Sequence, residues 1–351
     1  MDTGTAMPEL RRDPVVGYWT IISTERSRRP VEVKPKNLAE ERHCPFCEGR
    51  ESETTEEVYA IRKSDSHPNS PGWQVRAIKS KAPILSMDSE FDRFGRGMYD
   101  LMRGVGTHEL IVECPSHAPS LDELSVPEIG CVIEVYTQRF NELEKDLRFK
   151  YALLFKNHGL ISGSAHDIIR HTRSQLIATP ITPKRVKEEL VAAKNYFERR
   201  ERCVFCDILR QESEDGSRLV LQNKSFFAYC PFASRSPFEI WILPKKHCAD
   251  FGKLETILFL DLATILKECL SKIRRMLNDP PYNMILHTAP FRRRKKEGYW
   301  KTIEEDYHWY LQISPRLARD AGFEWGTGIY INPTPPEDAA QLLREIDAPA
   351  P

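Results

Sequence analysis

Two segments of the chain carry hydrophobic residues at the three- and four-residue spacing of an amphipathic helix. The first pattern follows Pro127, a residue that suits the first turn of a helix. The second pattern stops at Asn278-Asp-Pro-Pro281. The apolar positions are Ile129, Val132, Ile133, Tyr136, Phe140 and Leu143 in the first pattern, and Leu254, Ile257, Leu258, Leu262, Ile265, Leu266 and Ile273 in the second. We therefore predict two long helices, each with its apolar face on a sheet.

Short apolar runs that are typical of strands lie around both helical patterns. The strand candidates are residues 18–23, residues 108–113, a run from Tyr151, residues 238–243 and a run from Tyr282. A charged helix over residues 183–202 is expected to link the two parts. Strands interleaved with single long helices indicate an α+β protein with mainly antiparallel sheets.

The same order of elements occurs twice along the chain. Each half begins with a Cys-x-x-Cys pair, continues through a strand, a histidine, a long helix and another strand, and ends in a His-x-x-x-Gln strand. The pairs are Cys44/Cys47 and Cys203/Cys206, and the final strands read His171-Thr-Arg-Ser-Gln175 and His308-Trp-Tyr-Leu-Gln312. Self-similarity at such a long period indicates a duplicated domain. We predict an N-terminal domain over 1–195 and a C-terminal domain over 196–351.

Composition narrows the class of protein. A length of 351 residues suits two domains, and 51 basic residues balance 51 acidic ones, so no overall charge favours nucleic acid as a partner. The chain lacks an apolar run of membrane length and a signal sequence, which predicts a cytoplasmic protein without a membrane partner. In a reducing compartment, paired cysteines at short spacing indicate metal sites rather than disulfides.

Zinc prefers four nitrogen or sulfur ligands in a tetrahedron, and each half supplies two cysteines and two histidines in matching order. The predicted sites are Cys44, Cys47, His117 and His171 in the first half, and Cys203, Cys206, His247 and His308 in the second. With four protein ligands each, both sites would be structural. Alternatives stay open: the cysteine pairs could be reduced or redox-active, His43 could compete as a ligand, and His287 could be either a core residue or another ligand.

Several motifs, spread over most of the chain, resemble the galactose-1-phosphate uridylyltransferase branch of the histidine-triad superfamily, which includes ADP-glucose phosphorylases. They are Glu9-Leu-Arg-Arg-Asp-Pro14 with Trp19, Cys44-Pro-Phe-Cys47, Asn157-His-Gly159, Ser174-Gln175, Pro237-Phe-Glu-Ile-Trp241, Asn278-Asp-Pro-Pro-Tyr-Asn283 and Gly326-Thr-Gly-Ile-Tyr-Ile-Asn-Pro333. The resemblance implies two tandem histidine-triad-like domains, each a mainly antiparallel sheet with a long helix packed on it. It also implies zinc in two sites, with iron possible in one, and suggests a homodimer.

The chemistry that the resemblance implies is transfer of a nucleoside monophosphate group between a nucleotide sugar and a sugar 1-phosphate. In the family a strand reads His-x-His-x-Gln, in which the first histidine binds metal, the second attacks the α-phosphorus and the glutamine donates to phosphoryl oxygens. Substrate-binding positions implied here are Arg26, Arg28, Arg29, Asn157, Gly159, Ser162, Gly163 and Ser174.

This sequence departs from that pattern at the attacking residue. Counting back from Gln175 puts the metal histidine at His171 but an arginine, Arg173, at the attacking position. Arginine stays protonated and cannot attack phosphorus. Counting forward from Asn157 instead puts Ile168 and Arg170 at the two positions, which restores no nucleophile. In the second half Tyr310 stands at the corresponding place.

Three explanations follow from this departure. Arg173 could clamp the phosphates bidentately while His166 or His158 attacks or acts as a base. An incoming phosphate could instead attack directly, assisted by Arg173 and Gln175, which would make the protein a nucleotide-sugar phosphorylase or a hydrolase. The site could also bind a nucleotide sugar without turnover. The reading we adopt is a zinc-containing nucleotidyltransferase of the uridylyltransferase type, with Arg173, Gln175 and His166 as candidate catalytic residues.

Overall fold

The computed structural model describes residues 8–24, 43–88, 92–118, 120–163, 169–292, 300–318 and 321–346. These residues form an α+β fold built on a ten-stranded sheet, in which every pairing of neighbouring strands is antiparallel. The predicted fold class is thereby confirmed at this level. Within these ranges no helix has the length and apolar character needed to cross a membrane.

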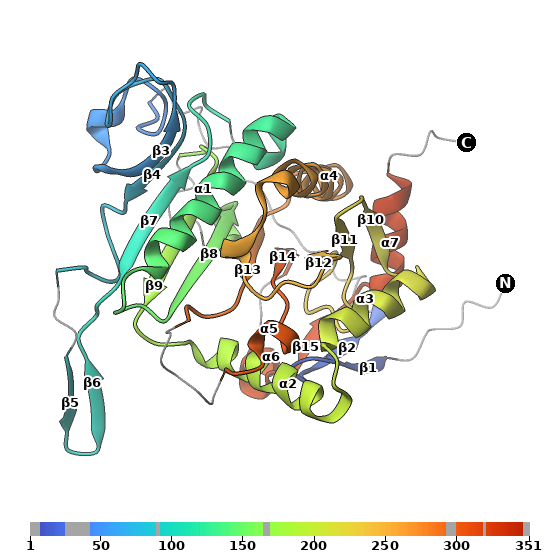
Figure 1. The fold of residues 1–351 in the computed structure, drawn as a ribbon. Coiled ribbons are helices and arrows are strands. Elements are labelled where there is room, and N and C mark those ends of the chain that lie inside the picture. The colour runs from blue at the N-terminus through green and yellow to red at the C-terminus, as the bar shows by residue number, and fades with distance from the viewer. Residues whose placement is uncertain are drawn as a thin grey trace.

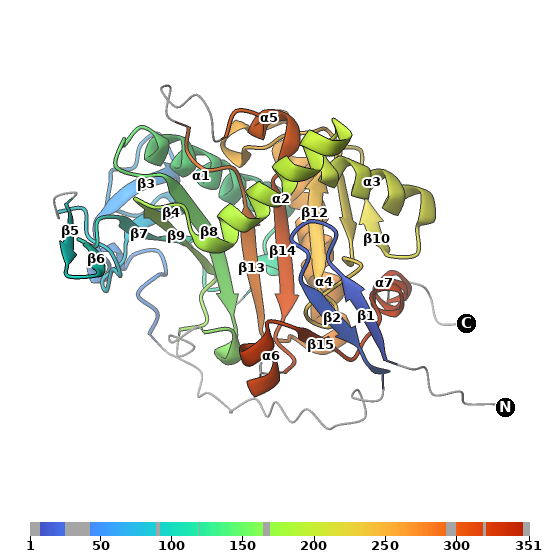
Figure 2. The same ribbon diagram turned by 90° about the horizontal axis from the view of Figure 1, so that it is seen from below.

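The sheet runs without a break through both halves of the chain (Figure 2). From one edge the N-terminal half supplies β3 (Glu57–Arg62), β4 (Trp73–Lys79), β7 (Thr107–Val112), β9 (Arg173–Thr179) and β8 (Tyr151–His158). The C-terminal half continues with β13 (Tyr282–His287), β14 (Tyr310–Pro315), β12 (Ile240–Pro244), β11 (Phe226–Tyr229) and β10 (Leu219–Gln222). The halves join where β8 pairs with β13 from Tyr282↔His158 to Leu286↔Leu154.

The two predicted long helices, α1 (Val126–Glu144) and α4 (Phe259–Leu277), pack side by side on one face of this sheet (Figure 1). All six predicted apolar positions of the first helix are buried. A capping box between Ser125 and Glu128 satisfies backbone donors at its start. The second helix begins later than predicted, because residues 256–258 form a 3-10 turn in which Ile257 is 80% exposed.

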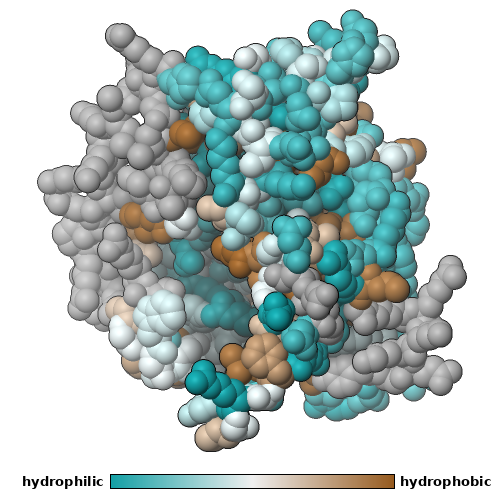
Figure 3. All heavy atoms as spheres, turned by 90° about the vertical axis from the view of Figure 1, so that its left-hand side faces the viewer, coloured by the Kyte–Doolittle hydropathy of each residue, from teal (hydrophilic) through white to brown (hydrophobic). Residues whose placement is uncertain are grey.

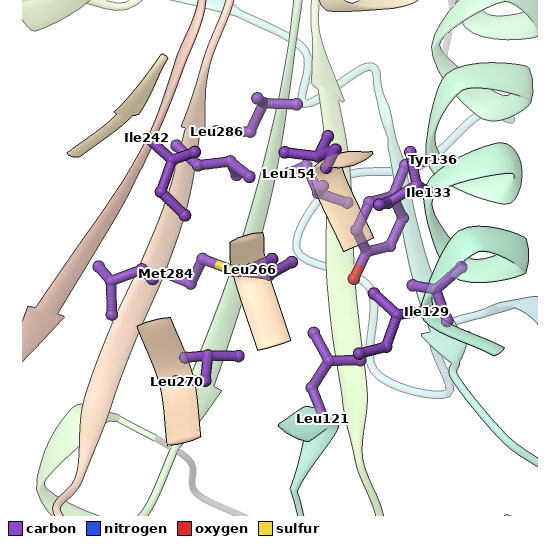
Figure 4. Close-up of a cluster of buried hydrophobic side chains, with 14 of the residues drawn as sticks. Leu121, Ile129, Ile133, Tyr136, Leu154, Ile242, Leu266, Leu270, Met284 and Leu286 are labelled. Atoms are coloured by element: carbon purple, nitrogen blue, oxygen red, sulfur yellow. The ribbon is translucent and has the colours of Figure 1, made fainter. Parts of the chain in front are cut away.

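A single hydrophobic core lies between these helices and the sheet, and residues from both halves contribute to it (Figure 4). Ile133 of α1 and Leu266 of α4 meet strand residues such as Leu154 and Met284 there. Burial of apolar side chains of this size stabilises a fold by about 1.5–3 kcal/mol each. The halves are therefore held together by packing as well as by backbone hydrogen bonds.

A second core covers the opposite face of the C-terminal strands. It contains Leu190 of α2 (Lys184–Arg200) and Phe205 of α3 (Val204–Asp215), which pack with sheet residues such as Tyr310. The charged linking helix predicted over 183–202 is thus present as α2. The predicted domain division after residue 195 falls inside α2 and stays a prediction.

The other described elements lie around the sheet. They are a small sheet of β1 (Glu9–Arg12), β2 (Trp19–Ile22) and β15 (Tyr330–Asn332), the hairpin β5 (Arg93–Arg96) and β6 (Tyr99–Met102), the helices α5 (Ile303–Asp306), α6 (Gly322–Thr327) and α7 (Pro336–Glu345), and 3-10 turns at 51–53, 121–123, 160–162, 251–253 and 256–258. The β5–β6 hairpin projects from the body in Figure 1. On the side that carries β3, the described hydrophobic residues in Figure 3 are scattered among hydrophilic ones.

Candidate metal centres and candidate active site

The structure brings the four residues of the first predicted metal site together. The ligand atoms of Cys44, Cys47, His117 and His171 all lie within 4.8 Å of one another. The His171 Nδ1 atom is 3.4 Å from Cys44 Sγ and 3.7 Å from Cys47 Sγ, and His117 Nδ1 is 3.7 Å from Cys47 Sγ. Two sulfur and two nitrogen donors at this separation fit a tetrahedral zinc ion.

Hydrogen bonding and burial prepare His171 to act as a metal ligand. Its Nε2 lies 2.9 Å from the carbonyl oxygen of Cys114, so Nε2–H donates there and leaves the Nδ1 lone pair for a metal. Burial lowers the pKa of His171 to about 4, which keeps the imidazole neutral at physiological pH. Burial and the neighbouring Cys44 raise the pKa of Cys47 to about 11, a thiol that a bound cation would deprotonate.

The second cluster contains Cys203, Cys206 and His247, whose ligand atoms lie within 4.8 Å of one another. The His247 Nδ1 atom is 3.3 Å from Cys206 Sγ, and its Nε2 lies 2.7 Å from the carbonyl oxygen of Glu304. A hydrogen bond from Cys203, together with His247, lowers the pKa of Cys206 to about 5. This cluster therefore offers two sulfur donors and an oriented imidazole.

The fourth predicted ligand of that site, His308, is not part of the cluster. Its ring lies next to that of His247, with centroids 5.3 Å apart, much as the rings of His117 and His171 lie 5.5 Å apart. The Nδ1 atom of His308 is instead 3.0 Å from the carbonyl oxygen of Trp309. Its Nε2 is buried and makes no hydrogen bond to the described residues, so Nε2 is the atom that could reach a metal.

We expect the purified protein to carry two zinc ions per chain. Replacing Cys44 with serine should lower this content to one, because the first site would lose a thiolate that holds the metal. Plasma mass spectrometry of the purified variant measures the ratio and also identifies iron. Cys131→Ser, at a half-buried cysteine outside both clusters, is the matched control. Metal-free wild-type protein, or an equal loss in the control, would contradict the assignment.

The candidate active site lies on the open face, by which we mean the face of β7, β9, β8 and β13 that is turned away from α1 and α4. Along β9 the half-buried residues Arg173 and Gln175 alternate with the buried residue Ser174. Arg173 and Gln175 therefore share the open face. Gln175 pairs across the sheet with Leu110 of β7 and Phe155 of β8.

Arg173 is held next to the first metal cluster. Its Nη1 donates to the carbonyl oxygens of Ile169, at 2.9 Å, and His171, at 3.0 Å. The guanidinium carbon lies 5.2 Å from the centre of the Phe46 ring, within the range of a cation–π contact. Phe46 lies between Cys44 and Cys47 in the sequence, so the metal-binding turn also supports the arginine.

A chain of hydrogen bonds crosses the open face from the other half of the protein. Asn283 of β13 donates through Nδ2 to Asn157 Oδ1 and to the carbonyl oxygen of Ser162, both at 2.8 Å. Arg316, one residue beyond β14, donates from Nε to Asn283 Oδ1 at 2.7 Å. A Cβ atom added to Gly163 would lie 3.8 Å from Asn157 Nδ2, so this glycine borders the same spot.

The structure corrects the prediction that Ser174 faces the substrate. Its hydroxyl is fully buried on the helix side of the sheet, 2.6 Å from Glu113 Oε1 and 2.7 Å from the Tyr136 hydroxyl. Lys156 joins the same network, with Nζ 2.5 Å from Glu113 Oε2 and 3.1 Å from the carbonyl oxygen of Arg173. Ser174 thus belongs to a buried polar network beneath the strand, while its neighbours Arg173 and Gln175 face the other way.

His158 also lies on the helix side. Its Nε2 is 2.9 Å from Asp279 Oδ1, and its ring stacks on Tyr282 with centroids 4.8 Å apart. These contacts exclude it as an attacking group beside Gln175. Gly159 and Ser162 make structural contacts, and their predicted roles in substrate binding stay predictions. Gly159 has a positive φ and approaches Pro281 so closely that a Cβ would lie 2.9 Å from its Cα, and the Ser162 hydroxyl donates to the carbonyl oxygen of Gly159.

Four other predicted site residues cannot be placed. His166, Arg26, Arg28 and Arg29 lie outside the described residues. The first lies in the sequence between residues 163 and 169, and the three arginines lie between residues 24 and 43. Their roles stay predictions.

The two repeated glutamines differ in how their amides are used. Gln312 pairs with Trp241 and Ile285, as Gln175 pairs with Leu110 and Phe155, so the two positions correspond. In Gln312 both amide atoms make hydrogen bonds: Oε1 lies 3.0 Å from His287 Nε2, and Nε2 donates to Glu239 Oε1 at 2.7 Å. Both amide atoms of Gln312 therefore already have a partner.

At Gln175 only the oxygen is used among the described residues. Its Oε1 lies 2.9 Å from His108 Nε2, and no described residue accepts a hydrogen bond from its amide nitrogen. The amide nitrogen can therefore donate to a ligand on the open face. Only the first half keeps this donor available.

Comparison with known proteins supports the family expected from the motifs. A family model for the N-terminal domain of galactose-1-phosphate uridyl transferase matches residues 2–183, and a model for its C-terminal domain matches residues 189–342. The chain belongs to the galactose-1-phosphate uridylyltransferase family.

Members of the uridylyltransferase family with two different activities align with nearly the whole chain. ADP-glucose phosphorylase of Arabidopsis thaliana is 35% identical over 345 residues, which cover 97% of this chain and 93% of the relative. Galactose-1-phosphate uridylyltransferase of Thermotoga maritima is 27% identical over 351 residues, which cover 97% of this chain and 99% of that relative. The crystal structure of the Arabidopsis phosphorylase with bound ADP-glucose matches with a TM-score of 0.79 and 35% identity. The match covers 96% of this chain and 99% of that chain.

Three residues of the candidate active site were missed by the sequence analysis: His108, Asn283 and Arg316. His108 lies in a predicted strand and Asn283 in a recognised motif, but nothing in the sequence gives the register that sets them near Gln175 and Asn157. Arg316 carries no local signal, because a single arginine after a strand is common on protein surfaces. Alternation along β13 would have placed Asn283 opposite the core once the strand pairing was known.

Proposed function

We propose that this protein catalyses phosphorolysis of a nucleotide sugar, moving the nucleoside monophosphate group onto inorganic phosphate. The observation that carries the proposal is the position of Arg173 on the open face beside Gln175. Because a guanidinium cannot attack phosphorus, the nucleoside monophosphate group is not transferred by way of a covalent bond to Arg173. The Arabidopsis relative, an ADP-glucose phosphorylase whose structure holds ADP-glucose, supports the choice of substrates.

The reaction is a single displacement at the α-phosphorus. An oxygen of inorganic phosphate forms a bond to that phosphorus, and the bond from the phosphorus to the bridging oxygen breaks, so hexose 1-phosphate leaves with the electron pair. The products are a nucleoside diphosphate and a hexose 1-phosphate. Arg173 binds the incoming phosphate through paired N–H groups. The Gln175 amide donates to a non-bridging oxygen of the α-phosphate, where charge develops.

A hexose 1-phosphate acceptor is the second candidate, in which the protein would act as a uridylyltransferase. The Thermotoga maritima relative carries that activity and aligns over 97% of this chain. In that reading the acceptor's phosphate takes the place of inorganic phosphate beside Arg173. Supplying each acceptor separately, with UDP-glucose or ADP-glucose as donor, distinguishes the two activities. Binding of nucleotide sugars without turnover of any donor and acceptor pair would contradict both proposed activities.

The scaffold that we propose for this reaction is a pair of histidine-triad-like domains held by zinc, with iron as the alternative in one site. Each half supplies five strands and one long helix to the sheet and its core, and this supports the proposal. The homodimer and the cytoplasmic location stay predictions.

Replacing Arg173 with glutamine should raise KM for inorganic phosphate by about 10- to 100-fold. Hydrogen bonds to a charged group contribute about 1.5–3 kcal/mol, and each 1.4 kcal/mol is a factor of ten. Initial rates at varied phosphate concentration, with nucleoside diphosphate quantified by chromatography, measure the change. Arg170→Gln is the matched control, because that exposed guanidinium pairs with Asp279 at 3.1 Å. Equal effects in the two variants would contradict the role of Arg173.

Intact-protein mass spectrometry during turnover tests the single displacement. We expect no nucleotidyl adduct on the wild-type protein when it is quenched with ADP-glucose or UDP-glucose in the absence of acceptor. An adduct on His166 would instead establish the two-step route that sequence analysis left open.

A further inference from the structure

Arg316 has no carboxylate partner among the described residues, whereas several other arginines near the sheet have one. Arg139, for example, pairs with Glu109 at 2.7 Å, and Arg274 pairs with Glu123 at 2.6 Å. The Nε atom of Arg316 donates to the amide oxygen of Asn283, while its terminal nitrogens make no hydrogen bond to any described residue. A half-buried cation that is oriented by a neutral side chain is typical of an anion site.

The guanidinium lies on the same face of the sheet as Gln175. Along β13 the residues of the helix-side core alternate with half-buried ones, and Asn283 belongs to the half-buried set. Ser314, the half-buried residue of β14, pairs with Asn283 and shares its face. Arg316 follows Ser314 by two residues and is also half-buried, so it continues that set. Its hydrogen bond to Asn283 fixes the guanidinium over β13.

Asn157 lies between this guanidinium and β9. Asn283 pairs with Asn157 in the register of β13 and β8, and Phe155 pairs with Gln175 in the register of β8 and β9. The strands β9, β8, β13 and β14 are consecutive, so three spacings of about 4.8 Å set the backbones that carry Arg173 and Arg316 roughly 14 Å apart. Asn157 Nδ2, between them, makes no hydrogen bond to a described residue as a donor.

Two cationic groups on opposite sides of uncharged donors suit an in-line transfer between two phosphates. In such a displacement the attacking and leaving oxygens lie on opposite sides of the α-phosphorus. The strand register places Asn157 and Asn283 between Arg173 and Arg316. If Arg173 holds the incoming phosphate and the diphosphate crosses the sheet over Asn157, the leaving phosphate lies toward β13 and β14. That is where the guanidinium of Arg316 lies.

We propose that Arg316 binds the phosphate of the departing hexose 1-phosphate, which in the bound substrate is the β-phosphate of the nucleotide sugar. Asn283 holds the guanidinium through Nε and leaves the terminal N–H groups for the phosphate oxygens. Asn157, oriented by the same Asn283, donates to the diphosphate from the other side. The C-terminal half thus supplies a substrate-binding residue, although both amide atoms of its own glutamine, Gln312, already have partners. This inference rests on the proposed function.

Arg316→Gln tests the assignment through product inhibition. We expect the inhibition constant of glucose 1-phosphate to rise at least about tenfold, the loss of one charge-assisted interaction of about 1.5 kcal/mol, while KM for inorganic phosphate stays within a factor of about two. Arg344→Gln is the matched control, because this exposed arginine on α7 contacts only backbone oxygens in the described chain. An unchanged inhibition constant, or a selective rise in KM for inorganic phosphate, would overturn the assignment.

Calorimetry separates failure of this inference from failure of the proposed function. Titrating glucose 1-phosphate and inorganic phosphate separately into wild type and Arg316→Gln needs no turnover. Selective loss of glucose 1-phosphate binding supports the role of Arg316 even if no substrate pair reacts, and equal binding by both proteins sinks it. Arg316→Lys serves if the glutamine variant fails to fold, because a lysine keeps the charge but not the paired donors, and weaker glucose 1-phosphate binding is again expected.

Discussion

Replacing Gln175 with alanine should lower kcat by about 10²- to 10³-fold, the usual effect of removing one donor to developing negative charge. The reason is that the amide nitrogen of Gln175 is available on the open face, while its oxygen is occupied by His108 Nε2 at 2.9 Å. The histidine thus fixes which end of the amide faces the ligand. Rapid-quench measurement of nucleoside diphosphate release at saturating substrates isolates kcat.

Gln312→Ala is the matched control for that experiment. This residue occupies the corresponding place in the second half, but both of its amide atoms are bonded to Glu239 and His287. Its loss should lower thermal stability, because the buried Glu239 and the half-buried His287 would each lose a hydrogen bond. The kcat value should stay within about threefold of wild type. A similar fall in kcat for both variants would mean that Gln175 acts through the fold rather than on the phosphate.

Replacing Lys156 with methionine should lower the free energy of unfolding by about 3–5 kcal/mol, because Glu113 would be left as a buried charge without its counterion. Both side chains are buried, and Lys156 Nζ has acceptors in Glu113 Oε2 at 2.5 Å, Thr172 Oγ1 at 2.8 Å and the Arg173 carbonyl oxygen at 3.1 Å. Three acceptors call for three N–H donors, so the amine is charged although burial lowers its pKa. Urea denaturation measures the loss.

The pH dependence of that loss gives a second test. Burial alone would raise the pKa of Glu113, but Lys156 and hydrogen bonds from Ser174 and Thr172 outweigh it, so the pKa lies below its ordinary value of 4.5. In wild type the carboxylate therefore stabilises the fold above about pH 4.5 and ceases to do so as pH falls through its lowered pKa. In Lys156→Met the deficit should be largest at neutral pH and shrink toward acid pH, where Glu113 is protonated. Glu113→Gln/Lys156→Met should recover part of the stability at neutral pH.

The apolar periodicity predicted the fold well because it is a property of long buried elements. Every apolar position assigned to the first helix is buried in α1. The second helix was predicted to start too early, since the hydrophobic residue Ile257 lies in an exposed turn, where the pattern alone cannot tell a packed residue from an exposed one. The pairing of β8 with β13, which merges the halves into one sheet, depends on register that no local pattern carries.

The site was harder to predict because polar residues occupy both faces of β9. Usually the apolar face of a strand identifies its buried side, but Thr172 and Ser174 are buried in the network around Glu113 while Arg173 and Gln175 face outward. A fully buried lysine, Lys156, makes this arrangement possible, and lysines are seldom buried. Only the three-dimensional structure shows which of two alternating polar sets faces the ligand.

The pairing of β8 with β13 implies that neither half of the chain would fold well without the other. If the two halves were separated, β8 and β13 would each lose the backbone hydrogen bonds of their pairing and become exposed edge strands. Each edge would lie next to hydrophobic core residues that are now exposed to water. An isolated half would therefore tend to aggregate through pairing of its exposed edge strand with an edge strand of another chain. The two halves of the chain are therefore expected to fold together as one unit, even though only the N-terminal half keeps a glutamine with an available amide nitrogen.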